Sequence, residues 1–396
     1  MDEMNPGRKA PPAKKRPNLF VRFLAFLVTL ALMVGAVVLV VNYDKLNFDS
    51  LKRRFTYRNL DRSESGQSES FVFEGGESSQ FAVLDHELLV CSGKDIRLYS
   101  GSEQVSLDQT VSIQNPVVDT VGNAALVYDA GGQSLFVYRD RAEAFSLSLE
   151  EEQQLLAASM NSQGWLVVVS QESGYKGIVT VYDNTFSPQI QLHLSSRFVM
   201  DAVLSPDSKS LALLTLGLNN NSFESRVDFY QLNRTEEETE PDWTCPVGGD
   251  VILAMRWDNS GIWALGETSL SILSPDGTVT GSCNYGDLYL KGFSLDGDGT
   301  AVLLLGKFRA GTSAELWAVN ADGETQALLS IEEQVLSLSA AGRYVALLTA
   351  DRLDIYNQDL EVYSTLEGTQ GAQTVLQQSD GSAMLIDSTT ARLYVP

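Results

Sequence analysis

Histidine and cysteine are both scarce in this 396-residue chain. The sequence has two histidines, His86 and His193, and three cysteines, Cys91, Cys245 and Cys283. No CxxC pair is present, and neither histidine has another histidine or cysteine at a metal-ligand spacing. The sequence therefore predicts neither a metal site nor a disulfide framework, although a single bridge between Cys245 and Cys283 remains open.

Recognisable catalytic motifs are also missing. The chain contains no GxSxG, no glycine-rich phosphate loop and no HExxH. We therefore expect no cofactor. Enzymatic activity stays uncertain, because a site can be assembled from acids that are scattered along a sequence, but we favour a protein that is not an enzyme.

Positive charge is sparse over most of the chain. The sequence has 28 Lys and Arg against 51 Asp and Glu, a formal net charge of −23, and residues 43–396 alone hold 22 bases against 49 acids. A strongly negative surface repels polyanions, so we expect no nucleic-acid partner.

The one long apolar run lies near the start of the chain. Residues 19–42 are almost entirely apolar and would extend roughly 34 Å as a helix, enough to cross a bilayer. We favour an uncleaved transmembrane helix over a signal peptide, because the run is too long and no small-x-small site follows. Residues 1–18, rich in Pro, Lys and Arg, are expected to be a disordered cytoplasmic tail.

Residues 43–70 are predicted to form a juxtamembrane stalk and linker. Their sparse apolar residues fit an amphipathic helix on the membrane surface, with Lys52, Arg53 and Arg54 near anionic headgroups. A solvated stalk fits equally well. The serine-rich segment 63–70 is typical of a flexible linker.

From residue 71 onward a unit of short strands recurs about every 42 residues, the spacing of four-stranded propeller blades. Asp201–Leu232 is the best-marked copy, with a Ser-Pro-Asp-Ser turn between two apolar strands. The third strand of each unit ends at Tyr99, Tyr138, Tyr182, Tyr230, Leu273, Ala318, Tyr356 and Tyr394. The pattern predicts an all-β, eight-bladed propeller over residues 71–396, with seven blades as the alternative.

The last unit has no outer strand of its own, whereas residues 71–73 form a strand that precedes the first complete unit. We therefore predict that residues 71–73 pair with the last blade and close the ring, which leaves only short, protected edges.

The turn Ser205–Ala212 is similar to the SPDGxxLA turn of the WD-repeat and TolB-like propeller superfamily, with Ser208 in place of the glycine. No unit carries the Gly-His and Trp-Asp signature pair of true WD repeats. The arrangement of anchor, stalk and eight units also resembles membrane-anchored propeller proteins of unknown function in Gram-positive bacteria. That resemblance implies a propeller displayed outside the cytoplasmic membrane and carries no catalytic motif.

Three loops between second and third strands are unusually long, at residues 171–177, 217–226 and 307–313. Propeller topology brings them to one face, opposite the face at which the chain enters. Their aromatic, amide and cationic side chains suit polar recognition. The candidate binding residues are Tyr175, Lys176, Asn219, Asn220, Phe223, Phe308 and Arg309.

These observations lead to one functional hypothesis and one alternative. The hypothesis is a single-pass membrane protein whose extracytoplasmic propeller binds a protein or a cell-wall component without catalysis. The alternative is a propeller enzyme that acts on a cell-surface glycan or peptide. The identity of the partner does not follow from the sequence.

Overall fold

The computed structural model describes residues 23–24, 26–30, 32–34, 48–58, 60–76, 78–101, 104–219 and 221–396. The chain divides into two units, Met1–Thr56 and Tyr57–Pro396. In the first unit, the described part of residues 23–34 is helical, and α2 spans Phe48–Thr56. Most of the predicted transmembrane segment lies outside the described residues, and no helix within them reaches the length and hydropathy needed to cross a membrane.

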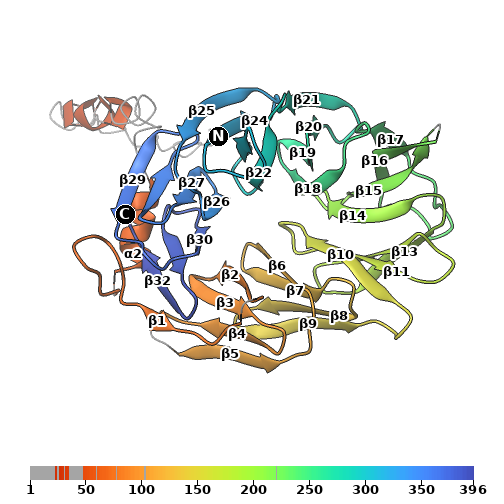
Figure 1. Ribbon diagram of the computed structural model, residues 1–396, viewed down its shortest axis with the longest axis horizontal. Coiled ribbons are helices and arrows are strands. Elements are labelled where there is room, and N and C mark those ends of the chain that lie inside the picture. Colours follow the sequence, from red (N-terminus) through yellow and green to blue (C-terminus); the bar gives the residue numbers. More distant parts are fainter. Residues whose placement is uncertain are drawn as a thin grey trace, which may run out of the picture. The chain divides into compact units, whose positions relative to one another are not determined.

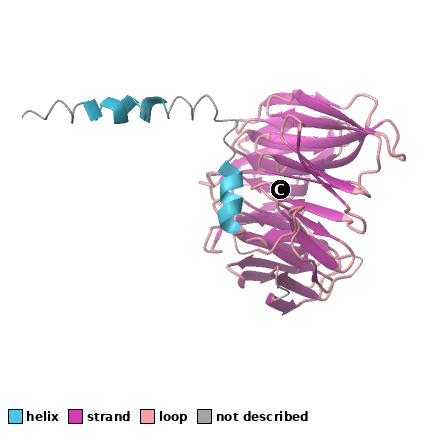
Figure 2. Cartoon of the chain, turned by 90° about the vertical axis from the view of Figure 1, so that its left-hand side faces the viewer, coloured by secondary structure: helices cyan, strands magenta, loops and turns pink. Residues whose placement is uncertain are grey.

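The second unit is an eight-bladed β-propeller, as the sequence predicts (Figure 1). The regular secondary structure in the described residues of this unit is all β-strand, and the strands form eight four-stranded antiparallel sheets (Figure 2). The compact unit begins at Tyr57, earlier than the predicted boundary at residue 71. Tyr57 is only 6% exposed.

We number the blades by chain order, and the strands of each blade run from the channel outward. Blade 1 comprises β2 (Gln80–Leu84), β3 (Glu87–Cys91), β4 (Asp95–Tyr99) and β5 (Val105–Thr110). Blade 2 comprises β6 (Pro116–Val121), β7 (Ala124–Asp129), β8 (Ser134–Arg139) and β9 (Ala142–Ser148). Blade 3 comprises β10 (Gln154–Met160), β11 (Leu166–Gln171), β12 (Gly177–Tyr182) and β13 (Pro188–Leu194). Blade 4 comprises β14 (Phe198–Leu204), β15 (Ser210–Asn219), β16 (Ser222–Gln231) and β17 (Trp243–Pro246).

The second half of the ring repeats this arrangement. Blade 5 comprises β18 (Ile252–Asp258), β19 (Gly261–Gly266), β20 (Ser269–Leu273) and β21 (Val279–Asn284). Blade 6 comprises β22 (Tyr289–Ser294), β23 (Thr300–Gly306), β24 (Ala314–Asn320) and β25 (Thr325–Ile331). Blade 7 comprises β26 (Ser337–Ala341), β27 (Tyr344–Leu348), β28 (Arg352–Tyr356) and β29 (Val362–Glu367). Blade 8 comprises β30 (Thr374–Gln377), β31 (Ala383–Ile386), β32 (Thr390–Tyr394) and β1 (Phe71–Val72).

The core lies between the blades, since both faces of each sheet are covered by its neighbours. Second strands such as β7, β19 and β23 are buried at every position, which explains their continuous apolar sequences. Outer strands such as β9 and β25 are mostly exposed. Buried residues of two adjacent blades form single clusters, as where β11 and β12 of blade 3 pack with β14 and β15 of blade 4.

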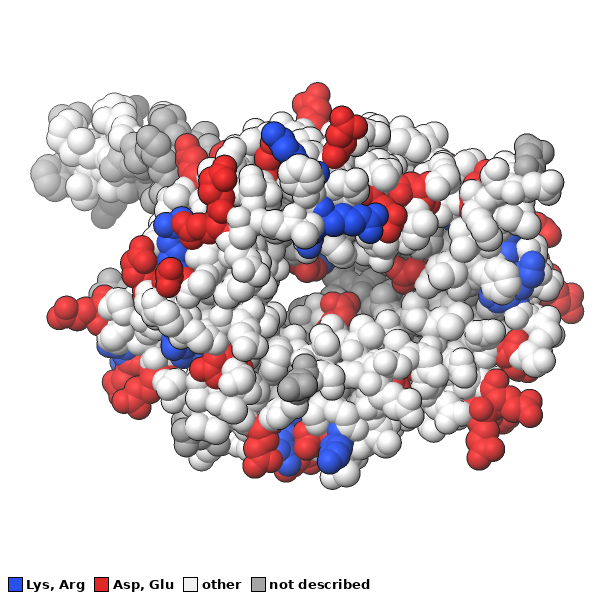
Figure 3. All heavy atoms as spheres, viewed as in Figure 1, with Lys and Arg blue, Asp and Glu red and all other residues white. Residues whose placement is uncertain are grey.

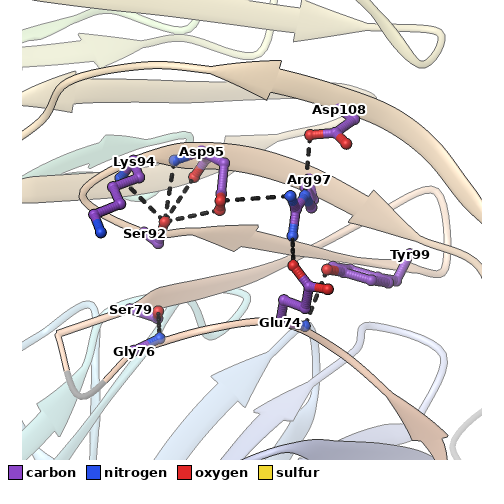
Figure 4. Close-up of polar contacts among 9 residues, drawn as sticks. All are labelled: Glu74, Gly76, Ser79, Ser92, Lys94, Asp95, Arg97, Tyr99 and Asp108. Atoms are coloured by element: carbon purple, nitrogen blue, oxygen red, sulfur yellow. Dashed lines mark hydrogen bonds and ion pairs between the residues drawn. The ribbon is translucent and has the colours of Figure 1, made fainter.

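The ring is closed by β1, which pairs with β32 through Phe71 and Val72. Phe71 is 1% exposed and packs in a cluster with residues of blades 1 and 8. The segment after β1 is then fastened to blade 1, because Arg97 on β4 forms ion pairs with Glu74, Asp95 and Asp108 (Figure 4).

The Ser-Pro-Asp-Ser turn connects β14 and β15. Ser208 has φ 58°, a left-handed conformation that favours glycine. Its hydroxyl accepts a 2.8 Å hydrogen bond from Asn161 Nδ2, which lies in the corresponding turn of blade 3. The serine therefore connects two blades through this hydrogen bond, while its positive φ costs some backbone strain.

The three cysteines are all buried and unpaired. Cys245 lies in β17 and Cys283 in β21, the outer strands of neighbouring blades. The bridge that the sequence left open is therefore not formed.

Candidate functional site: the rim of the central channel

The first two candidate residues, Tyr175 and Lys176, lie in the β11–β12 loop of blade 3. Tyr175 is 41% exposed and its ring contacts that of His193, with 4.9 Å between centroids. Lys176 reaches toward blade 4, where its ammonium lies 5.1 Å from the centre of the Phe198 ring. The absence of a side chain at Gly177 lets the backbone of blade 3 lie close to Val199 of blade 4, because a Cβ at Gly177 would lie 2.5 Å from Val199 Cγ2.

The predicted loop at residues 217–226 is wrong in form. Instead of a loop, β15 and β16 continue as a ladder that pairs Leu218 with Phe223 and Asn219 with Ser222. Leu218 and Phe223 are 64% and 72% exposed, so the hairpin carries an apolar pair on its tip. Asn219 donates a 2.8 Å hydrogen bond to Glu224 Oε1, and Asn220 lies outside the described residues.

The base of this hairpin is held by Arg197, whose side chain is only 11% exposed. Its guanidinium donates to the Glu224 carbonyl oxygen at 2.6 Å and to Thr215 Oγ1 at 3.1 Å, and it pairs with the Glu224 carboxylate. These bonds hold the base of the hairpin in one conformation.

The remaining candidates lie in the β23–β24 loop of blade 6. Phe308 is 75% exposed, and the Arg309 guanidinium lies 5.3 Å from the centre of the Tyr289 ring. Lys291 on β22 donates to the Gly311 carbonyl oxygen and so anchors the same loop. Blade 5 separates this group from the residues of blades 3 and 4.

An apolar surface at the start of the inner strands bridges that gap. We call it the apolar rim, and its members come from blades 4, 5 and 6, whose inner strands lie side by side around the ring centre (Figure 1). Each member is between 43% and 51% exposed, apart from Val251 at 57%. The apolar rim comprises Phe198, Met200, Val251, Leu253 and Tyr289.

A β-bulge helps to expose this surface. In β10, β14, β18 and β22 one extra residue interrupts pairing with the second strand, and these residues are Leu156, Met200, Leu253 and Lys291. The inner strands of blades 1, 2, 7 and 8 pair with their second strands in regular register. Bulges redirect side chains and concentrate near binding sites, so this run of four marks one half of the ring as distinct.

The channel inside the rim carries charged groups. Cavities of about 490, 310 and 210 Å³ share Asp119 and Arg256 in their walls. Arg256 forms an ion pair with Asp296, and acidic side chains are visible in the central hollow in Figure 3. Asp119 and Asp201 each accept a 2.8 Å hydrogen bond from the N–H of the next residue.

Both of these carboxyl groups have raised pKa values. The pKa of Asp201 is raised to about 7, chiefly by burial and to a smaller extent by the negative charge of Asp119, against the opposing hydrogen bonds from the Ala202 and Met255 N–H groups. Enclosure likewise raises the pKa of Asp119, against the opposing effects of the Thr120 N–H and the Arg256 charge. By surface area Asp119 is exposed and Asp201 half-buried, so water in the channel reaches both groups and limits the shifts.

The sequence did not reveal the apolar rim or the channel acids. Asp119, Asp201 and Arg256 belong to three different blades and meet only when the ring closes. Met200 and Leu253 are apolar residues in strands, and such residues are ordinarily buried. Within the described residues, no group of three or more His, Cys, Asp or Glu side chains could hold a metal ion.

The chain enters the propeller at the face opposite the apolar rim. Tyr57 hydrogen-bonds His86 Nδ1 at 2.8 Å and Ser382 Oγ at 3.0 Å. These two residues lie in turns between first and second strands, whereas the long β11–β12, β15–β16 and β23–β24 connections emerge at the other ends of the strands. Upstream, Lys52 is exposed and Arg53 is buried, and the side chain of Arg54 lies outside the described part of the chain.

Comparison with known proteins supports the fold. The C-terminal WD40 domain of Sif2 superposes with a TM-score of 0.54 at 11% sequence identity, covering 78% of this chain and 92% of that domain. At this identity the similarity concerns the fold alone. No curated protein gives a significant sequence match. Residues 56–388, which span nearly the whole propeller, match the profile described as a family of unknown function (DUF5711), and the chain therefore belongs to that family.

Proposed function

We propose that this protein is a membrane-anchored, extracytoplasmic binding module that holds a partner protein on the apolar rim and the neighbouring loops. The observation that supports this proposal best is the run of bulged inner strands in blades 3–6, next to the exposed side chains of the rim. Several exposed apolar side chains on one surface mark an interaction site, because exposing them to water is unfavourable.

The neighbouring loops add to this surface. Phe223 and Phe308 are among the most exposed aromatic residues of the described propeller, and aromatic side chains are enriched at the centres of protein interfaces. Arg197 holds the hairpin and Lys291 holds the β23–β24 loop, so both aromatics are presented on anchored supports.

Photocrosslinking tests the binding role. A benzoylphenylalanine at Phe198 or Leu253, in the full chain in its native membrane, is expected to yield a discrete protein adduct. The same probe at Leu328 or Val362, exposed apolar positions on the outer strands β25 and β29, is expected to yield none. Equal adducts at all four positions would contradict a specific interface at the rim.

The membrane anchor is part of the proposal and rests on the sequence of residues 19–42. The described residues of this segment are helical, and Phe23, Phe26 and Leu32 are 60%, 62% and 69% exposed. Such side chains are unfavourable in water and suit a lipid environment. We expect the chain to stay in the membrane after carbonate extraction, and the propeller to be cleaved by protease added outside intact cells. Release by carbonate, or full protection from protease, would overturn this part.

An enzyme remains the second candidate, and the channel acids favour it. Asp119 and Asp201 have raised pKa values, as general acids often do, and Asp119 lines the channel cavities. Asp119→Asn and Asp201→Asn separate the two functions. A binding protein keeps its crosslinked adduct in these variants, whereas an enzyme that uses these groups loses turnover of a cell-surface glycan or peptide.

A further inference from the structure

Building on the proposed function, we infer that the partner docks through an acidic segment that also carries apolar side chains. The apolar rim would take the apolar side chains, and cations placed around it would bind the carboxylates. This inference concerns the chemistry of the partner, and it can fail while the protein-binding role stands.

Four basic residues border the rim. Lys176 lies beside Phe198, Lys291 is itself a bulge residue of β22, and Lys307 and Arg309 are exposed in the β23–β24 loop. None of these four has an ion-pair partner among the described residues. By contrast, Arg97, Arg141, Arg197, Arg226, Arg234, Arg256 and Arg352 are all paired with acids. In a chain with net charge −23, a group of cations without ion-pair partners on one surface is a candidate site for an anionic ligand group.

Several acids on the same side of the ring are already engaged. Glu224 pairs with Arg197, Asp250 accepts hydrogen bonds from Thr268 and Ser269, and Glu315 accepts one from Trp317 Nε1. Glu267, Asp287 and Glu332 are exposed on this side of the ring, and Glu150, Glu151 and Glu152 lie at the entry to blade 3. The preference for an anionic partner therefore depends on the four cations that border the rim, and not on the net charge of this face.

The placement of the cations defines how a ligand would lie. Lys176 and Arg309 each rest near an aromatic ring of the rim, at 5.1 and 5.3 Å from the ring centres. A carboxylate that reaches either cation thus brings its neighbouring side chain against Phe198 or Tyr289. A purely anionic polymer would leave Met200, Val251 and Leu253 uncovered, and this favours a protein segment that offers both kinds of group.

A random 12-residue peptide library, selected against the purified full chain, tests the inference. We expect enriched peptides to combine Asp or Glu with Leu, Phe or Trp, and to bind more weakly at 500 mM than at 50 mM salt. The triple variant Lys176→Gln, Lys291→Gln, Arg309→Gln is expected to weaken the best peptide on the order of tenfold, since each exposed ion pair contributes about 1.5- to 5-fold. The double variant Met200→Asp, Leu253→Asp is expected to lower affinity on the order of a hundredfold.

Matched controls come from elsewhere on the propeller. Lys94→Gln changes an exposed lysine in the β3–β4 loop of blade 1, and Leu328→Asp changes an apolar residue that is 53% exposed on β25. Both are expected to leave peptide affinity unchanged. An unchanged melting temperature in every variant shows that lost binding is not lost folding.

The outcomes separate the two levels of the proposal. Neutral or basic peptides that the rim variant no longer binds would refute the acidic chemistry and leave the protein-binding role intact. Peptides that bind the rim variant as tightly as the wild type would refute both. If a glycerol-phosphate polymer binds with charge-variant sensitivity and no peptide is enriched, the partner is a polyanion and the inference is wrong.

Discussion

Replacing Phe71 by alanine tests whether β1 holds the ring together. The Phe71 side chain is 1% exposed and packs with residues of blades 1 and 8, whereas its neighbour Val72 is 59% exposed. Truncating a fully buried phenylalanine removes its apolar burial and leaves a cavity, which together destabilise a protein by about 3–5 kcal/mol. Val72→Ala is the matched control and is expected to cost less than about 1 kcal/mol.

The expected melting shift follows from the size of the propeller. Unfolding entropy of about 2.1 cal/mol/K per residue gives roughly 0.7 kcal/mol/K for a unit the size of Tyr57–Pro396. A loss of about 4 kcal/mol then lowers the melting temperature by about 6 °C. Intrinsic fluorescence measures this directly, because all five tryptophans lie in the propeller. If Val72→Ala lowers the melting temperature as much as Phe71→Ala, burial of Phe71 is not what stabilises the closure.

Three further predictions concern single residues. Arg97→Ala leaves the Glu74 carboxylate without its partner and is expected to lower the free energy of unfolding, measured by urea denaturation, by about 1–2 kcal/mol. The loss should be smaller in 1 M salt, which screens ion pairs. A loss that does not depend on salt would argue against the ion pairs. Ser208→Ala loses the hydrogen bond from Asn161 but keeps the left-handed backbone strain, and it is expected to lower the free energy of unfolding by about 1 kcal/mol. Ser208→Gly loses the same hydrogen bond but relieves the strain, so it should be nearly neutral. Equal losses of stability in the two variants would contradict this explanation. The pKa of Asp201 in the folded protein lies near 7, above its unfolded value, so the wild type loses stability as the pH rises from about 4 through 7. Asp201→Asn should therefore have a higher melting temperature than the wild type at pH 8, and this gain should shrink toward pH 5. A difference in melting temperature that stays constant with pH would refute the raised pKa.

Local signals in the sequence were sufficient to predict the blades. Tyr99 ends β4 and Tyr356 ends β28, as predicted, because a continuous apolar second strand followed by turn residues specifies each hairpin locally. The hairpin at residues 217–226 was misread, since a run of asparagines is typical of a loop. The pairing of Leu218 with Phe223, together with the hydrogen bond from Arg197 at the base of the hairpin, outweighs the preference of asparagine for loops.

The candidate site was only partly accessible to such reasoning. Tyr175, Phe223 and Phe308 can be predicted as candidates because the spacing between strands makes long connections visible. Met200 was missed, since a bulge depends on the pairing of two strands and leaves no pattern in one of them. Asp119 was missed because its neighbours in the channel come from distant blades.

Closure through β1 also constrains how the protein is made. Phe71 pairs with Ala391, so the two halves of blade 8 are synthesised more than three hundred residues apart. Until β32 has emerged from the ribosome, β1 has no partner and the growing blades form an open arc with an unpaired sheet at each end. Closure of the ring therefore cannot precede the end of synthesis, because it needs residues from both ends of the propeller.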